Sequence, residues 1–284
     1  MSLPKLWING SELGRLSAQD RGFRYGDGVF ETFRIHCGRI HLWQYHLDRL
    51  QRGLDALGIA LTEDRIAAEL AAALDDLQVN GIEEAAGRLQ VTRGDSPHGY
   101  RAPSGQPPIT ISLTEVRRWR APATATALYL CQTRLATQPA LAGLKHCNRL
   151  EQVLAAQELN ALNFQGEGIQ LNGAGNIACG VSSNLFLVTD DSFITPALTA
   201  CGIEGTVRRL LLEVLLPGRG LEVQVRDVTS AELLSADEVL LTNALSGIRN
   251  AGACQVAGVN AAFTCTKWGD TLRRDFYDWC EREE

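Results

Sequence analysis

The stretch Gly143-Leu144-Lys145-His146-Cys147-Asn148-Arg149-Leu150-Glu151-Gln152 decides how this chain of 284 residues is interpreted. It holds one of only three lysines, whereas the chain carries 24 arginines. An amine can lose its proton and form a Schiff base with an aldehyde, while a guanidinium stays protonated. Lys5 lies near the terminus and Lys267 in a charged C-terminal segment, so we expect Lys145 to be the nucleophilic lysine. The alternative is a surface lysine that precedes a helix.

The composition is that of a soluble globular enzyme, with 45% hydrophobic and 21% charged residues. At 284 residues the chain is long enough for two domains. Its net charge of -6 argues against a nucleic-acid partner, because phosphate binding needs a basic face. No apolar run has the length of a membrane span and no signal peptide is recognisable, so we expect a cytoplasmic protein without a membrane partner.

The eight cysteines predict reduced thiols and no metal site. They are scattered, they form no C-x-x-C pair, and no histidine stands at zinc-ligand spacing from them. Their positions are Cys37, Cys131, Cys147, Cys179, Cys201, Cys254, Cys265 and Cys280.

Hydrophobic patterning predicts two mixed α/β domains. The first spans residues 1–116 and the second, which carries Lys145, spans residues 124–284. Residues 117–123 interrupt the pattern with arginine, tryptophan and proline, and we interpret them as an interdomain linker. Helices are predicted over Trp43–Leu57, Glu63–Leu77, Thr206–Leu216 and the C-terminal segment around Trp268 to Trp279.

A further helix is predicted directly after Lys145. Asn148 is a residue type that caps helices, and Glu151 follows it at the spacing of a capping box. We therefore expect this helix to begin at Asn148.

Several segments match one known family. They are Asp20-Arg21-Gly22-Phe23-Arg24-Tyr25-Gly26-Asp27-Gly28-Val29-Phe30-Glu31-Thr32, His46-Leu47-Asp48-Arg49-Leu50, Ser183-Asn184-Leu185-Phe186 and Gly202-Ile203-Glu204-Gly205-Thr206-Val207-Arg208. Together they resemble the fold-type IV pyridoxal-phosphate enzymes, the class IV aminotransferase family. The string around Lys145 is most similar to the 4-amino-4-deoxychorismate lyase branch. The resemblance implies the two-domain α/β fold of D-amino-acid aminotransferases, a homodimer, and pyridoxal 5'-phosphate as cofactor.

The resemblance also implies which residues hold the cofactor. Lys145 would carry it, and Arg49 would bind its phosphate, for which a guanidinium fork is well suited. The glycine-bearing turn before Thr206 offers backbone N–H groups at a helix start, which favour a dianion. For Arg49 the alternative is a solvated helix charge, and for Asn243 it is a turn residue. The complete implied set is Lys145, Arg49, Cys179, Ile203, Gly205, Thr206, Asn243 and Ala244.

Substrate binding is expected on a loop after Arg93. Related enzymes often carry Arg-Gly-Tyr there, whereas this chain has His98-Gly99-Tyr100-Arg101. His98 replaces an arginine that would bind a carboxylate, and Arg101 is the expected substitute. Thr32 is expected to position a water or hydroxyl group near the leaving group. The predicted substrate-binding residues are Tyr25, Arg93, His98 and Arg101.

Cys179 departs from the family pattern. The family keeps a glutamate five residues before the asparagine that is Asn184 here, and this glutamate pairs with the pyridine nitrogen. A carboxylate keeps that nitrogen protonated, which makes the ring an electron sink. A thiol is only a weak hydrogen-bond partner, so we expect a largely unprotonated nitrogen and weaker carbanion chemistry. The alternative is that Cys179 is a buried strand residue and another acid takes this role.

The predicted activity is 4-amino-4-deoxychorismate lyase, which forms 4-aminobenzoate and pyruvate for folate synthesis. Aromatisation of the product ring is downhill, so this reaction tolerates a poor electron sink better than transamination does. Two alternatives stay open. One is a branched-chain or D-amino-acid aminotransferase of the same fold, and the other is a catalytically impaired relative that binds pyridoxal phosphate or a small anion.

Overall fold

The computed structural model describes residues 5–12, 14–96, 99–102, 110–117, 126–256 and 258–282. Packing divides the chain into two compact units, one of Met1–Ala121 with Leu144–Asn148 and one of Pro122–Gly143 with Arg149–Glu284. The Lys145 segment therefore belongs to the first unit, whereas the sequence placed it in a domain over residues 124–284. Residues 118–123 of the expected linker lie outside the described residues.

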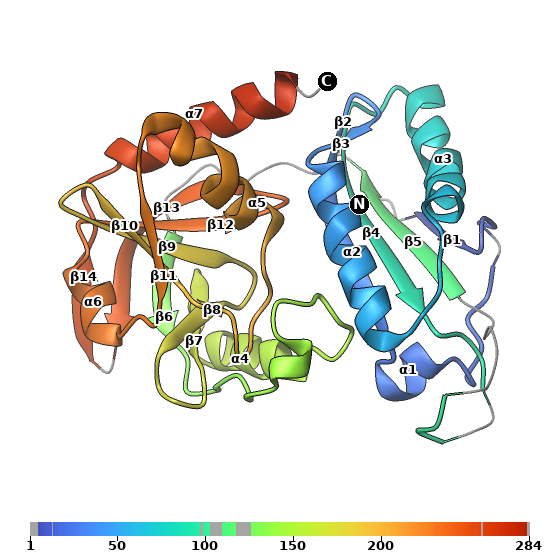
Figure 1. Cartoon of the computed structure of the whole chain (residues 1–284), viewed down its shortest axis with the longest axis horizontal. Helices are drawn as coiled ribbons and strands as arrows, with labels where there is room; N and C mark the ends of the chain where they lie inside the picture. Colours follow the sequence, from blue (N-terminus) through green and yellow to red (C-terminus); the bar gives the residue numbers. More distant parts are fainter. Residues whose placement is uncertain are drawn as a thin grey trace. The chain divides into compact units, whose positions relative to one another are not determined.

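The described part of the first unit contains a five-stranded antiparallel sheet in the order β1-β5-β4-β2-β3 (Figure 1). Helices α2 and α3 pack on one face of it, and the short helix α1 precedes β2. The elements are β1 (Lys5–Ile8), α1 (Arg21–Tyr25), β2 (Gly28–His36), β3 (Arg39–Ile40), α2 (Trp43–Leu57), α3 (Glu63–Val79), β4 (Glu84–Thr92) and β5 (Thr110–Arg117).

Because side chains alternate along each strand, one face of this sheet points into the core and the other points away from it. Phe30 and Thr32 of β2 stand in register with Gln90 and Arg88 of β4, on the face away from α2 and α3. The residues between them on both strands point into the core. This core contains Val29, Phe33, Ile35, Leu47, Leu50, Leu54, Ile66, Leu70, Leu77, Leu89 and Val91.

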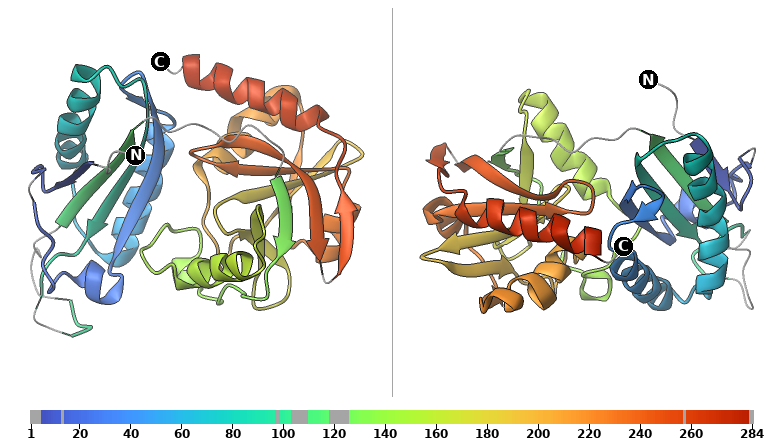
Figure 2. Two further views of the ribbon diagram at one scale, coloured as in Figure 1. Left: turned by 180° about the vertical axis from the view of Figure 1, so that it is seen from behind. Right: turned by 90° about the horizontal axis from the view of Figure 1, so that it is seen from above.

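The second unit is built on a nine-stranded mixed sheet that curls until β8 contacts β9 and β10 (Figure 2). Its strand order is β11-β10-β9-β12-β13-β6-β7-β8, with β14 paired to β13. The strands are β6 (Thr126–Leu130), β7 (Glu167–Leu171), β8 (Ile177–Gly180), β9 (Asn184–Thr189), β10 (Ser192–Pro196), β11 (Val223–Arg226), β12 (Glu238–Asn243), β13 (Gly247–Val256) and β14 (Val259–Ala262). The α-helices are α4 (Leu150–Ala161), α5 (Thr206–Leu210), α6 (Ser230–Ser235) and α7 (Lys267–Arg282).

The mixed α/β class is confirmed, as are the helices predicted over Trp43–Leu57 and Glu63–Leu77, the second of which extends to Val79. Helix α1 was not predicted, and the helix after Lys145 begins differently. The residue before α4 is Arg149, which makes no side-chain cap. The Asn148 side chain instead donates to the carbonyl of Gly26 (3.1 Å), and Glu151 accepts from the backbone N–H of Ala136 (2.8 Å). The predicted capping box is therefore wrong, because the Asn148 side chain bonds to Gly26 of the first unit and the Glu151 side chain bonds to Ala136 of the second unit.

Other differences concern the second unit. The helix predicted over Thr206–Leu216 is α-helical only to Leu210 and continues as a π-helical turn over Leu211–Leu215. The sequence did not predict β10, β13, β14 or α6. None of the helices within the described ranges has the length and apolar character needed to cross a membrane.

Candidate active site

Lys145 is fixed against β2 by backbone pairing. The N–H of Phe30 donates to the carbonyl of Lys145 (2.9 Å), and the N–H of Cys147 donates to the carbonyl of Gly28 (2.9 Å). Lys145 is half-buried, and its Nζ lies 4.5 Å from the centroid of the Phe30 ring. The amine therefore lies on the sheet face that carries Phe30, opposite the core.

Arg49 belongs to a buried polar cluster between β2 and α2. Glu31 accepts from Arg49 Nε (2.8 Å) and from Arg49 Nη2, and its other contact is with His46 Nδ1 (2.6 Å). Burial alone would raise the pKa of Glu31, but the charge and hydrogen bonds of Arg49 and the bond from His46 lower it to about 2. Burial lowers the pKa of His46, and the charges of Arg49 and Lys145 act in the same direction. Arg49 is thus a buried, ion-paired residue and not a solvated helix charge.

This cluster predicts an acid-sensitive fold. Glu31 has a folded-state pKa of about 2 against an ordinary 4.5, so below pH 4.5 the unfolded chain takes up a proton that the folded chain does not. Stability from Glu31 is complete above pH 4.5 and is lost as the pH falls toward 2, by about 3 kcal/mol in full. We expect the unfolding free energy in urea to fall more steeply between pH 5 and pH 3 in the wild type than in Glu31→Gln.

Glu84→Gln is the matched control for this pH series. Glu84 also has a pKa lowered by its partner Arg34, but this pair lies nearer the surface. Its removal is expected to change the slope less than the removal of Glu31. Parallel slopes for the wild type and Glu31→Gln would show that Glu31 is not the acid-sensitive group.

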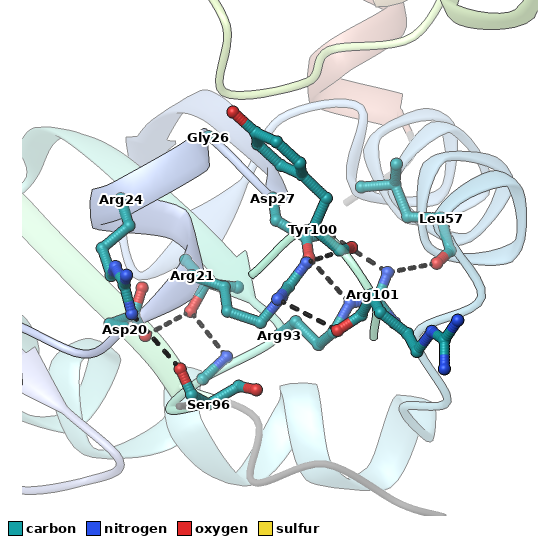
Figure 3. A network of polar contacts seen from close by, with 12 residues as sticks. Asp20, Arg21, Arg24, Gly26, Asp27, Leu57, Arg93, Ser96, Tyr100 and Arg101 are labelled. Carbon is teal, nitrogen blue, oxygen red and sulfur yellow. Dashed lines mark hydrogen bonds and ion pairs between the residues drawn. The ribbon is translucent and has the colours of Figure 1, made fainter. Parts of the chain in front are cut away.

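A second network in the first unit ties the loop after Arg93 to α1 (Figure 3). Asp27 accepts from Arg21 Nε (2.7 Å) and Arg93 Nε (2.8 Å). Arg21 also donates to the carbonyls of Gly99 (2.6 Å) and Tyr100 (3.0 Å). Burial would raise the pKa of Asp27, but the hydrogen bonds from Arg93 and Arg21 lower it.

The structure gives the surroundings of three of the four predicted substrate-binding residues. The Arg93 guanidinium is buried and engaged by Asp27 and by the carbonyls of Leu57 and Gly58. Tyr25 is half-buried, with its ring 5.3 Å from that of the exposed Tyr100. Arg101 is exposed on the same loop, and His98 lies outside the described residues.

In the second unit, Asn184 shapes the turn that leads into α5. Its side chain donates to the carbonyl of Ile203 (2.9 Å) and accepts from the N–H of Gly205 (2.9 Å). A Cβ atom at Gly205 would lie 2.1 Å from Asn184 Oδ1, so a larger residue would displace the Asn184 side chain from its hydrogen bonds. The next residue, Thr206, is buried, and its hydroxyl has no hydrogen-bond partner among the described residues.

Cys179 lies beside this same turn. It is buried on β8, packs with Leu135, Ala178 and Cys201, and would be 3.9 Å from a Cβ atom at Gly202. Burial raises the pKa of the Cys179 thiol to about 12, with smaller contributions in the same direction from Cys201 and Glu167. The thiol is therefore uncharged at neutral pH.

Asn243 ends β12, against which α5 packs, and its side chain forms a local turn. Its Oδ1 accepts from the backbone N–H groups of Leu245 (3.1 Å) and Ser246 (2.7 Å). Ala244, which follows Asn243, is half-buried. The turn interpretation of this side chain therefore holds, and a contact of this turn with a phosphate stays a prediction. Within the described ranges, no group of three or more His, Cys, Asp or Glu side chains could hold a metal ion.

Sequence reasoning assigned no role to Glu31, His46 or Asp27. A signal for Glu31 was available: it is the one charged residue on the otherwise apolar face of β2, between Val29 and Phe33. Such a position requires a partner, and the adjacent helix supplies His46 and Arg49 three residues apart.

Comparisons with known proteins agree with this architecture. The chain is 36% identical to an aminodeoxychorismate lyase of Vibrio harveyi over 263 residues, covering 90% of this chain and 91% of that one. It matches the crystal structure of a 4-amino-4-deoxychorismate lyase from Pseudomonas aeruginosa with a TM-score of 0.83 and 37% identity, over 96% of this chain and 97% of that one. A branched-chain amino acid aminotransferase of Escherichia coli shares the fold at a TM-score of 0.84 and 21% identity, over 98% and 94% of the two chains.

The amino-transferase class IV family matches residues 28–254. The chain therefore belongs to this family. The matched region includes the Glu31 cluster, the Lys145 segment, Cys179 and the turn before α5.

Proposed function

We propose that this protein is a pyridoxal-phosphate-dependent 4-amino-4-deoxychorismate lyase, which forms 4-aminobenzoate and pyruvate for folate synthesis. The observation that carries the proposal is the 36% identity to the Vibrio harveyi lyase over 90% of the chain. The Pseudomonas aeruginosa protein, which is 37% identical, is named for the same activity.

The residues present fit the cofactor. Lys145 supplies an amine on a segment held by β2, and Arg49 supplies a guanidinium whose orientation Glu31 fixes. The close-fitting Gly205 and the unpartnered Thr206 hydroxyl suit a phosphate oxygen. Lys145 would carry the cofactor, and its phosphate would be held by Arg49, the turn Ile203–Thr206 and the turn at Asn243 and Ala244.

Lys145 and Thr32 have separate proposed roles in the reaction of the substrate. When bound, pyridoxal phosphate delocalises the electron pair that proton removal leaves on carbon. Lys145 acts as the general base that removes the proton from the amine-bearing carbon of the substrate. Thr32, half-buried on the Phe30 face of β2, positions a water or hydroxyl group at the pyruvyl leaving group.

Cys179 favours the lyase over an aminotransferase. An uncharged thiol cannot keep a proton on the pyridine nitrogen through charge, so carbanion chemistry is weakened. Loss of pyruvate is drawn forward by aromatisation of the ring. Transamination has no such driving force and must pass through the weakened step in both half-reactions.

Cys179→Glu is expected to increase cofactor affinity and turnover. A carboxylate that pairs with the ring nitrogen makes a charge-assisted hydrogen bond of about 1.5–3 kcal/mol, or about tenfold or more in the dissociation constant. The larger side chain costs about 1–3 kcal/mol in a packed pocket, so thermal stability should fall. Cofactor fluorescence titration and kcat measure the two gains.

Cys179→Gln is the matched control, because glutamine has the size of glutamate without its charge. It is expected to show the stability loss without either gain. If the Glu and Gln variants bind the cofactor equally and turn over equally, the missing carboxylate is not what limits this enzyme.

We further propose a cytoplasmic homodimer. Helix α4, which follows the Lys145 segment, exposes three apolar side chains at helical spacing, Leu150, Val153 and Leu154. Such a stripe is typical of a surface that a second copy covers. Light scattering on the purified protein measures its molecular mass in solution. A monomeric mass at micromolar concentration would reject the dimer.

The lyase proposal is tested by incubating the protein with aminodeoxychorismate, with and without added pyridoxal phosphate. We expect 4-aminobenzoate to form, at a rate that rises with cofactor occupancy. A protein that binds the cofactor but forms no 4-aminobenzoate would instead be the catalytically impaired relative.

A further inference from the structure

Arg88 contacts the same aromatic ring as the proposed reacting amine, on the sheet face that carries Phe30. Its Cζ lies 3.6 Å from the centroid of the Phe30 ring, and Lys145 Nζ lies 4.5 Å from the same centroid. Both cationic groups therefore share one aromatic ring. Thr32, in register with Arg88 across β2 and β4, lies on the same face.

Within the described residues, Arg88 lacks the anionic partner that the other buried or half-buried arginines of this unit have. Asp27 pairs with Arg21 and Arg93, Glu31 pairs with Arg49, and Glu84 pairs with Arg34. Arg88 Nη2 donates to the neutral amide oxygen of Gln90 (2.9 Å). Among the side chains that the structure describes, no carboxylate is paired with Arg88.

This arrangement leaves an anion-binding group on the ring that Lys145 also contacts. Arg88 is half-buried, and burial lowers its pKa, with the Cys147 thiol acting in the opposite direction. A partly desolvated cation without a carboxylate partner is unfavourable, and an anion that binds there relieves this. A guanidinium stacked on a ring keeps its in-plane N–H donors for a planar carboxylate.

We propose that Arg88 binds a carboxylate of the substrate and so orients the amine-bearing carbon toward Lys145. The inference rests on the proposed lyase function, whose substrate carries two carboxylates. One carboxylate leaves in pyruvate and the other remains in 4-aminobenzoate. Arg88 takes the carboxylate-binding role for which the sequence favoured Arg101. The other predicted arginine, Arg93, has its guanidinium engaged by Asp27 and by backbone carbonyls.

The test compares Arg88→Gln with Arg34→Gln, using holoenzyme in both cases. Arg34 lies on the same face of the sheet but is paired with Glu84, so its variant is the matched control. Loss of a charge-assisted contact is expected to raise KM for aminodeoxychorismate about tenfold or more in Arg88→Gln. Arg34→Gln is expected to keep the wild-type KM. Arg88→Lys, which keeps the charge but not the fork, should recover part of the loss.

Competitive inhibition by the two products identifies the carboxylate. If Arg88→Gln weakens inhibition by 4-aminobenzoate, Arg88 holds the ring carboxylate, and if it weakens inhibition by pyruvate, Arg88 holds the leaving one. An unchanged KM together with unchanged inhibition by both products overturns the proposal.

The role of Arg88 can also be tested if the protein has no lyase activity. Should the wild type form no 4-aminobenzoate, calorimetric titration with 4-aminobenzoate and with pyruvate still tests the site. Binding of either compound that Arg88→Gln or Arg88→Lys weakens supports the role of Arg88. Equal binding by all variants, or no binding by the wild type, contradicts it.

Discussion

Lys145→Ala is expected to lower the turnover of aminodeoxychorismate by at least about 10²–10⁴-fold, which is the usual contribution of a general base alone. The physical reason is that Lys145 is the proposed attachment point of the cofactor and also the proposed base. Its segment is held to β2 by two backbone hydrogen bonds, so the variant should keep its fold. Steady-state assays of 4-aminobenzoate formation measure the loss.

Lys267→Ala is the matched control, since Lys267 is an exposed lysine paired with Asp191 (2.7 Å). It should retain wild-type turnover. Borohydride reduction of the wild-type protein, followed by peptide mapping, should place the pyridoxyl group on Lys145. A reduced cofactor on Lys5 or Lys267, or full activity of Lys145→Ala, would refute the assignment.

Arg49→Ala is expected to weaken cofactor binding about tenfold or more and also to destabilise the fold. The second effect arises because the substitution leaves the Glu31 carboxylate buried without its cation. Breaking a buried pair in this way costs about 3–5 kcal/mol. Cofactor titration and urea unfolding measure the two effects separately.

Two further variants separate phosphate binding from packing. Arg52→Ala removes an exposed arginine of the same helix and should change neither quantity much. The double variant Glu31→Gln with Arg49→Met removes both charges, so it should recover much of the stability while cofactor binding stays weak. Wild-type cofactor affinity in this double variant would show that Arg49 does not hold the phosphate.

Much of the fold could be predicted from local patterns. The apolar spacing of Leu47, Leu50 and Leu54 predicted the helix that became α2. The apolar pattern of Val29 to Ile35 predicted the strand that became β2. Strand β13 was missed because Arg249, Asn250 and Gly252 interrupt its apolar pattern. Its backbone pairs with β12, β6 and β14, and these long-range partners stabilise a segment of weak local signal.

In the candidate site, some residues could be predicted from the sequence, whereas their long-range contacts could not. Lys145 was predicted from the scarcity of lysine and from its motif, and Cys179 from its register with Asn184. The partners of charged residues could not be predicted, because they come from segments far apart in the chain. Arg93 is an example: a sequence-based candidate for substrate binding whose guanidinium is occupied by Asp27, 66 residues away. Arg88, which no motif marked, shares the Phe30 ring with Lys145 and has no carboxylate partner among the described side chains.

We propose that this class IV family member is a lyase and not an aminotransferase. One measurement tests it most directly: a single reaction that contains the holoenzyme, aminodeoxychorismate, D-alanine and 2-oxoglutarate, with all products quantified. We expect equal amounts of 4-aminobenzoate and pyruvate, independent of the keto acid, with little glutamate formed. Glutamate formation that depends on 2-oxoglutarate and exceeds 4-aminobenzoate formation would contradict it.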